Sequence, residues 1–321
     1  DKINNPLYDD YVKDLLCFAT MIGGLEDSVP QPAPLSIQKA YADLGEKVGI
    51  LFHSLNGFDS ESLHPLKPDI IGEHFVFESL SPPNKTKQTR KIWIQSAWKC
   101  NPNKFSAFLE HSVSDYAYQG SKKTNSIFEN FIWMKPDNNA ALEDYAHLLF
   151  SITYIEGLGL DKGKKAVSLL ADLLKQYPSD KTAIYYAMGL SNMTLYNQDV
   201  FSLREYLKKL RHLLEINPSK SFAEFYSSSL VNITNYDPDI KAKRRYKLEL
   251  QNLLMEYPYP EIALTYGKGL VNMTLYDPDI KAKRGYKLEL QNMLIRYPYP
   301  EMAVIYEQGL INMMLYDPDI T

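Results

Sequence analysis

A 40-residue internal repeat constrains this chain more than any other feature of its sequence. Residues 237–276 and 277–316 are identical at 29 of 40 positions, and the pentapeptide YDPDI recurs at 236–240, 276–280 and 316–320. Asparagine recurs in the same register at positions 192, 232, 272 and 312. A period of this length is typical of arrays in which each unit is one supersecondary element. The second half of the chain is therefore predicted to be a repeat array.

Each repeat unit has the pattern of two helices. Apolar residues recur every three or four positions over 262–273 and again over 246–257, as the buried face of a helix requires, and no strand-like alternation appears. Stacked helical hairpins share one continuous core, which predicts an α-solenoid. The 40-residue period is near that of HEAT repeats, but the order Tyr-Gly-Lys-Gly-Leu at 266–270 favours a tetratricopeptide-like unit with lengthened helices.

Proline and aspartate mark the predicted ends of these helices. Asp277 is expected to cap the second helix of a unit, with Pro278 at the first helical position, where a missing N–H costs nothing. Tyr257-Pro258 should end the preceding second helix, and Pro260 suits the first turn of the next helix. YDPDI is therefore predicted to be the turn between the two helices. A calcium site is disfavoured, because one Asp-Pro-Asp supplies too few oxygen ligands.

The first 140 residues do not repeat. Helical patterning covers 11–26, where Gly23-Gly24 should end the helix, and then 31–55 and 92–117, with a break at Pro102. Segment 66–80, with Asp69 as its expected N-cap, is either a buried helix or contains a strand through HFVF at 74–77. Residues 81–91 are predicted to be a polar, basic linker.

Composition excludes several classes of protein. The net charge of −4 gives no argument for nucleic acid, and no apolar run approaches the length of about 18 residues that spans a bilayer. Cys17 and Cys100 are too few for a disulfide framework, so we expect a cytoplasmic protein in a reducing compartment.

Signatures of catalysis are also weak. None of the six histidines forms a metal-binding pair in the sequence, and neither cysteine lies in a nucleophile signature. The nearest match to a phosphate-binding loop, GLGLDKGKKA at 157–166, has the wrong glycine spacing and Lys165 where Ser or Thr is required. It is interpreted as a loop between helices. We expect no enzyme activity, no metal site and no cofactor in this chain, with an enzyme whose site is hidden as a third alternative.

Three stretches of the first half carry a resemblance to a known family. LLCFATMIGGLE (15–26), LKPDIIGEHFVFESL (66–80) and AWKCNPNKFSAFLEHSVSDYA (97–117) follow one another in order, and PDIIGE at 68–73 is the most specific part. This resembles the segment after the nucleotide-binding domain in bacterial STAND NTPases, the NLR-like proteins that include the antiviral Avs group. In that family an effector and a P-loop ATPase precede a helical and winged-helix region, and tetratricopeptide-like repeats then sense a target.

The resemblance implies an organisation for this chain. Residues 1–92 would be the helical, winged-helix-like region, 93–140 connecting helices, and 141–321 the tetratricopeptide-like solenoid, which we expect to be truncated at its C-terminus. The overall fold class is all-α. The start at Asp1 leads us to expect a segment excised from a larger protein, whose other parts would bind ATP and Mg²⁺.

The resemblance also implies a function, namely the sensor segment of an antiviral immune NTPase in the bacterial cytoplasm. A viral (phage) protein would bind the repeats and drive nucleotide-dependent oligomerisation of the full-length protein. The alternative is a stand-alone tetratricopeptide-like adaptor that binds a host protein or peptide. Neither alternative involves a membrane, and nucleic acid is disfavoured.

Two sets of residues are candidates for protein binding. By register with the tetratricopeptide pattern, one set faces the inner surface of the solenoid: Glu261, Lys268, Asn272, Glu301, Gln308 and Asn312. The recurring asparagine also has a structural interpretation, in which it holds the turn between helices by hydrogen bonds. The other set is a basic stripe formed by Lys241, Arg244, Lys281 and Arg284. These cations oppose the dipole at a helix N-terminus, so they favour either an acidic partner or pairing with nearby Asp-Pro-Asp carboxylates.

Overall fold

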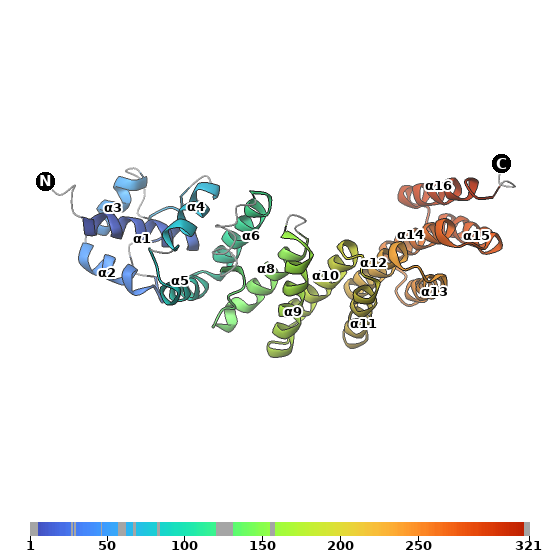
Figure 1. Cartoon of the computed structure of the whole chain (residues 1–321), viewed down its shortest axis with the longest axis horizontal. Helices are drawn as coiled ribbons and strands as arrows, with labels where there is room; N and C mark the ends of the chain where they lie inside the picture. Colours follow the sequence, from blue (N-terminus) through green and yellow to red (C-terminus); the bar gives the residue numbers. More distant parts are fainter. Residues whose placement is uncertain are drawn as a thin grey trace. The chain divides into compact units, whose positions relative to one another are not determined.

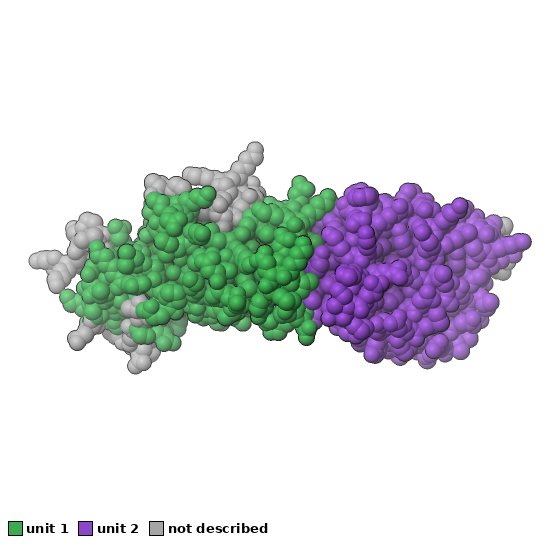
Figure 2. Space-filling view, turned by 90° about the horizontal axis from the view of Figure 1, so that it is seen from below, with its two compact units in different colours: residues 1–182 green, residues 183–321 purple. Residues whose placement is uncertain are grey.

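The computed structural model describes residues 6–26, 28, 30–45, 47–56, 62–66, 69–81, 84–119, 131–154 and 158–317. Across these residues the regular structure is helical, as expected, and the extended backbone makes a single antiparallel bridge between Leu25 and Leu63. The chain divides into two compact units, residues 1–182 and 183–321 (Figure 2).

Unit 1 is built around its first helix. α1 contacts α2, α4, α5 and α6, and its buried side chains include Leu15 and Phe18. Later in the unit, α8 packs against α9 as a hairpin. The helices are α1 (Pro6–Ile22), α2 (Leu35–Leu44), α3 (Lys47–Asn56), α4 (Asp69–Ser79), α5 (Lys87–Cys100), α6 (Pro102–Gln119), the short 3-10 helix η1 (Asn139–Ala141), α8 (Leu142–Tyr154) and α9 (Leu160–Gln176) (Figure 1).

Glycine and proline end the helices of unit 1 where the sequence indicates. α1 ends at Ile22 because Gly23 takes a positive φ of 82°, and the Gly24 N–H then donates to the Ala19 carbonyl oxygen at 2.8 Å. The patterned segment 31–55 is two helices, since Gly45 with φ of 51° separates α2 from α3. The expected break at Pro102 is confirmed, with α6 starting at this proline.

Three expectations for unit 1 need correction. Residues 74–77 lie within helix α4, so the strand alternative is wrong and the helix alternative is confirmed; the side chain of Asp69, its expected cap, lies outside the described part. The linker is shorter than predicted, because α5 starts at Lys87, after Thr86 has capped it by accepting from the Thr89 N–H. Residues 160–166 of the phosphate-loop match are the first turns of α9 rather than a loop, and 155–157 lie outside the described residues.

Unit 2 is a stack of helices of nearly equal length. We call α10, α12, α14 and α16 the first helices and α11, α13 and α15 the second helices of the repeats. Neighbours in sequence pack together from α11 to α16, and the first helices α12, α14 and α16 also pack on one another. Their starts fall 20 residues apart: α10 (Asp180–Tyr196), α11 (Val200–Ile216), α12 (Lys220–Tyr236), α13 (Ile240–Glu256), α14 (Pro260–Tyr276), α15 (Ile280–Arg296) and α16 (Pro300–Met314) (Figure 1).

The YDPDI segment is the turn between first and second helices, but its capping residue differs from the prediction. α15 starts at Ile280, and its N-cap is Asp279, whose Oδ1 accepts from the Lys281 N–H at 2.9 Å. Asp277 instead belongs to the C-terminal end of α14, and Pro278 precedes the helix. The corresponding Asp239 caps α13 in the same way, whereas Pro318–Thr321 of the third copy lie outside the described part. The expected ends at Tyr257-Pro258 and the start at Pro260 are confirmed.

Candidate protein-binding surface

A buried aspartate ties each second helix to the turn of the next repeat. Asp277 is fully buried, and its carboxylate accepts from Arg244 Nε and Nη2 of α13, both at 2.8 Å. The Tyr286 hydroxyl of α15 donates to the same carboxylate at 2.9 Å, and the Asp279 N–H donates at 3.0 Å. The arrangement recurs one repeat earlier with Arg204, Asp237 and Tyr246, and the arginine–aspartate pair recurs with Arg284 and Asp317.

This environment keeps Asp237 and Asp277 ionised. Burial raises the pKa of Asp277, but the hydrogen bonds from Arg244, from the Asp279 backbone and from Tyr286 outweigh it, so the pKa lies below its ordinary value. Asp237 shows the same balance. Arg244 and Arg284 of the predicted basic stripe therefore pair with an Asp-Pro-Asp carboxylate, and that carboxylate belongs to the following repeat.

The recurring asparagine joins consecutive first helices. Asn272 Nδ2 donates to Thr234 Oγ1 at 2.7 Å, and Asn312 Nδ2 donates to Thr274 Oγ1 at 3.3 Å. Asn232 and Thr194 make the same contact at 3.0 Å. The asparagine thus makes structural hydrogen bonds, as one interpretation predicted, but it holds the neighbouring first helix rather than the turn between helices. Asn272 and Asn312 are half-buried and buried, respectively, between repeats.

The other predicted inner-surface residues are accessible. Glu261 pairs with Lys220 Nζ at 2.8 Å across α12 and α14, and this hydrogen bond lowers the pKa of Glu261. Gln308 is exposed and donates to Asn312 Oδ1 at 3.3 Å. Lys268 and Glu301 are exposed on α14 and α16. A role of these side chains in binding stays a prediction.

The exposed lysines of the basic stripe lie on a ridge that the sequence analysis missed. Lys241, Leu248 and Met255 are spaced by seven residues, two helical turns, and so share one face of α13. Lys281, Leu288 and Ile295 occupy the same positions on α15. The apolar members are 55%, 68%, 58% and 72% exposed for Leu248, Met255, Leu288 and Ile295. We call these six residues the second-helix ridge.

The two helices of the ridge are neighbours. Lys247 Nζ of α13 donates to Glu289 Oε1 of α15 at 2.8 Å, next to Leu248 and Leu288 in sequence. The ridge was missed because leucine at a helical spacing ordinarily belongs to the core. The sequence contained one signal for the ridge. At helical spacing, Leu248 and Met255 lie on a different face of the helix from the core residues Leu250 and Leu254, which are buried.

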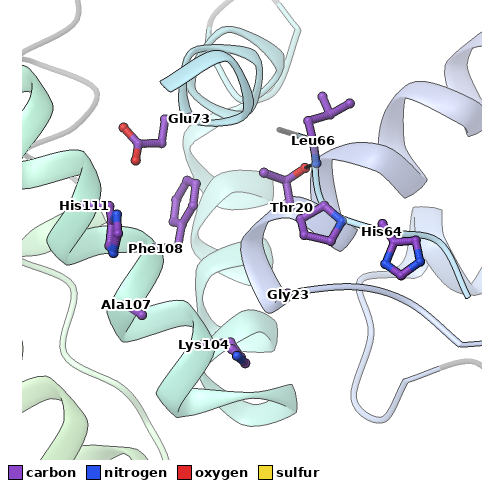
Figure 3. Close-up of a pocket in the computed structure, with 10 residues that line it drawn as sticks. Thr20, Gly23, His64, Leu66, Glu73, Lys104, Ala107, Phe108 and His111 are labelled. Atoms are coloured by element: carbon purple, nitrogen blue, oxygen red, sulfur yellow. Dashed lines mark hydrogen bonds between the residues drawn. The ribbon is translucent and has the colours of Figure 1, made fainter. Parts of the chain in front are cut away.

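Unit 1 contains a cavity of roughly 390 Å³ between α1, α4, α6 and residues 64–66. Figure 3 shows Glu73 from α4 and His111, Phe108 and Lys104 from α6 around it. Glu73 is buried, whereas Lys104 and His111 are exposed at the rim. Thr20 Oγ1 of α1 accepts a hydrogen bond from the Leu66 N–H at 3.2 Å. This bond attaches residues 64–66, which line one side of the cavity, to α1. The cavity thus combines a buried carboxylate with exposed cationic or titratable groups.

Other kinds of site find no support in the described residues. No three His, Cys, Asp or Glu side chains there are grouped so that they could hold a metal ion. Within the same residues, no helix has the length and apolar composition that crossing a membrane requires. Comparisons of the chain with models of protein families, with curated proteins and with solved structures found no match.

Proposed function

We propose that this chain recognises a protein through its repeats and serves as the sensor segment of a STAND-type antiviral immune NTPase. The repeats would be tetratricopeptide-like, and residues 1–92 a winged-helix-like region that relays binding of a viral protein. ATP and Mg²⁺ would bind elsewhere in the full-length cytoplasmic protein and drive its oligomerisation. The basis for the family is the resemblance of residues 15–26, 66–80 and 97–117.

The second-helix ridge is the observation that carries protein recognition. Scattered exposed apolar side chains are ordinary, but here they recur at matching positions on two neighbouring helices. Lys241 and Lys281 extend the same faces toward the helix N-termini. Such a surface suits a polypeptide with apolar side chains and acidic groups. The apolar side chains would pack on the exposed apolar residues of the ridge, and the acidic groups would pair with its two lysines. The inter-repeat contacts use other residues, so the ridge can vary without disturbing the stack.

Affinity capture tests recognition. The immobilised chain is exposed to lysates of phage-infected and uninfected bacteria, and bound proteins are identified by mass spectrometry. We expect one dominant viral protein, lost from the double variant Leu288→Asp, Ile295→Asp. The control is Leu35→Asp on α2, which replaces a leucine of unit 1 that is still more exposed than Leu288 and Ile295. Loss of binding in both variants, or in neither, would argue against the ridge.

The same experiment separates the adaptor from the sensor. A host protein captured equally from both lysates would favour the stand-alone adaptor. Sequencing the gene upstream of Asp1 tests the family, because a STAND protein must encode a P-loop ATPase there. A gene without one would remove the basis for the sensor proposal and leave protein recognition to be judged by capture alone.

A further inference from the structure

The second-helix ridge belongs to a longer row of exposed residues on each of its two helices. Successive members of a row are separated by four, three, four and three residues, so they follow one line along the helix. The exposed rows are Lys241, Arg245, Leu248, Asn252 and Met255 on α13, and Lys281, Gly285, Leu288, Asn292 and Ile295 on α15. Alternation of four and three is the spacing through which one helix contacts another that packs along it.

Exposure of the rows does not depend on where the array ends. α13 is followed by α14 and α15, and Leu248 and Met255 are nevertheless more than half exposed. The equivalent Leu288 and Ile295 on α15 are more than half exposed as well. The packing of consecutive repeats therefore leaves this face of the second helices uncovered.

The apolar part of the rows keeps its chemistry where the two repeats differ. Met255 is replaced by Ile295 one repeat later, so the position stays apolar. The adjacent exposed position changes its charge, from Glu256 to Arg296. An exposed position that stays apolar beside one that reverses its charge favours a contact surface.

The preceding second helix limits this surface. On α11 the positions of Leu248 and Met255 are occupied by Lys208 and Glu215. Both residues are exposed and charged, so among α11, α13 and α15 the apolar part of the rows is confined to the last two. A partner that needs apolar contacts must therefore lie on α13 and α15.

α13 and α15 run side by side in the same direction. Short turns join α14 to both of them, so each is antiparallel to α14. Lys247 Nζ of α13 donates to Glu289 Oε1 of α15 at 2.8 Å and bridges the two helices. The Lys247 side chain is only 13% exposed, less than the rows on either side of it. The rows thus flank one strip of surface, which over the 14 residues from Lys241 to Met255 is about 21 Å long.

Cationic side chains gather at one end of this strip. Lys241, Arg245 and Lys281 are exposed near the N-termini of α13 and α15, where they oppose the helix dipoles. The buried aspartates pair with Arg244 and Arg284 instead. Within the part of the chain that the structure describes, the three exposed cations have no ion-pair partner. Acidic groups of a partner are therefore favoured at this end.

We propose that the protein bound by the ridge presents an amphipathic helix, which lies along α13 and α15 with an acidic end beside Lys241 and Lys281. This inference rests on the protein recognition proposed above. Apolar side chains of the partner helix cover the apolar members of the two rows. The helix has about four turns or more, since the strip is about 21 Å long.

Asn252 and Asn292 set the register of this helix. Each lies between the two apolar positions of its row, so both amides face the partner inside the contact. A polar side chain must lie opposite them, because a buried amide without a hydrogen-bond partner is costly. One polar position within an apolar row fixes the register of paired helices in the same way. From the cationic end, the partner row therefore reads acidic, acidic, apolar, polar, apolar.

An extended segment fits the rows less well. Its backbone N–H and C=O groups would lie against helices, whose own backbone groups are already paired, and would find no backbone partners there. A helix pairs its own backbone groups and presents side chains at the spacing of the rows.

Fluorescence anisotropy with two labelled synthetic peptides tests this inference. Each is an alanine- and glutamine-based helix of about 18 residues, long enough to span the rows. Its four-three row reads Glu, Glu, Leu, Asn, Leu in one peptide, and the same order runs in the opposite chain direction in the other. We expect one of them to bind the 321-residue chain. A proline placed in the middle of that peptide should weaken binding about tenfold or more, because it breaks the helix.

Variants of the chain locate the bound peptide. The double variant Leu248→Asp, Leu288→Asp should raise the dissociation constant about tenfold or more, because one apolar anchor is lost from each row. The matched control is Ile216→Asp on α11, since this isoleucine is 60% exposed and lies outside the rows. The control should leave the dissociation constant unchanged.

Charge reversal tests the acidic end of the helix. Lys241→Glu combined with Lys281→Glu should weaken binding of the acidic peptide about tenfold, and a peptide with lysines in place of its glutamates should recover it. Lys268→Glu changes an exposed lysine of α14 outside the rows and should have neither effect. Circular dichroism verifies that each variant is folded.

Binding of neither peptide would overturn the inference, as would equal binding of the proline-containing peptide or binding that the aspartate variants leave intact. Binding that charge reversal leaves unchanged would overturn the acidic end. These results are separable from the proposed function. A viral protein captured through the ridge while neither peptide binds would leave recognition standing without the helix. Peptide binding at the rows without a captured viral protein would support the helix surface and argue against the sensor.

Discussion

Arg244 and Asp277 lie 33 residues apart, yet their side chains form a two-bonded ion pair with both nitrogen–oxygen distances at 2.8 Å. The aspartate is fully buried, whereas the arginine is about half exposed. The carboxylate therefore depends on the arginine, on Tyr286 and on the turn backbone for the interactions it loses with water. Through this pair, the position of one second helix is coupled to the turn that starts the next.

Removing this carboxylate should destabilise unit 2 more than removing the helix cap beside it. We expect Asp277→Ala to lower the free energy of unfolding by about 2–3 kcal/mol, because it leaves the Tyr286 hydroxyl and the turn N–H without their acceptor. Asp279→Ala removes only an exposed N-cap and should cost about 1 kcal/mol. Urea unfolding followed by circular dichroism compares the two. Equal losses would contradict the structural role of Asp277.

The carboxylate of Asp277 also predicts that the protein loses stability at acidic pH. The pKa of Asp277 is lowered from its ordinary value of 3.8, so the folded protein holds this proton less tightly than the unfolded chain. The pairing thus contributes stability that is fully present above pH about 4 and is lost as the pH falls through the folded-state pKa. Unfolding free energies measured from pH 5 downward should fall less steeply in Asp277→Asn than in the wild type. An unchanged slope would refute the assignment.

Two glycines should respond to alanine in opposite directions. A Cβ on Gly72 would lie 2.8 Å from the Leu66 carbonyl oxygen and 2.9 Å from Thr20 Cγ2, so α4 or its neighbours must shift. Gly72→Ala should cost unit 1 about 1–3 kcal/mol. Gly285 on α15 meets nothing within 4 Å, and Gly285→Ala should add about 0.5–1 kcal/mol through helix propensity.

Different probes measure these two changes. All three tryptophans lie in unit 1, so tryptophan fluorescence during urea unfolding reports Gly72→Ala. Hydrogen exchange of peptides from α15 reports Gly285→Ala. Stabilisation by Gly72→Ala would show that the packing of α4 against residue 66 is looser than described.

The contact between Asn272 and Thr234 should couple neighbouring first helices. A double-mutant cycle with Asn272→Ala and Thr234→Val should give a coupling energy of about 0.5–1.5 kcal/mol, the net contribution of one hydrogen bond. The control cycle uses Lys268→Ala and Ser228→Ala, which are exposed residues at matching positions of the same two helices. Coupling of similar size in both cycles would argue against a specific bond.

Local chemistry explains why the helices of unit 2 could be predicted. Pro260 starts α14, and Tyr257-Pro258 ends α13, because proline acts on the backbone of its immediate neighbours. The 3.6-residue pattern of apolar residues likewise needs no knowledge of distant residues. In unit 1 the same reasoning placed the end of α1 at Gly23. It left 74–77 ambiguous, because a short apolar run suits a strand and a buried helix equally.

The candidate site depended on contacts that no local pattern contains. Arg244 and Lys241 are neighbours in one basic run, but only the first reaches an aspartate of the next repeat while the second stays exposed. Asp277 was assigned to a cap because the turn offers two aspartates and their sequence does not reveal which is buried. The repeat alone determined that two helices alternate every 20 residues. Which polar side chains hold those helices together, and which remain on the surface for a partner, was decided by tertiary packing, since the partners lie one repeat away.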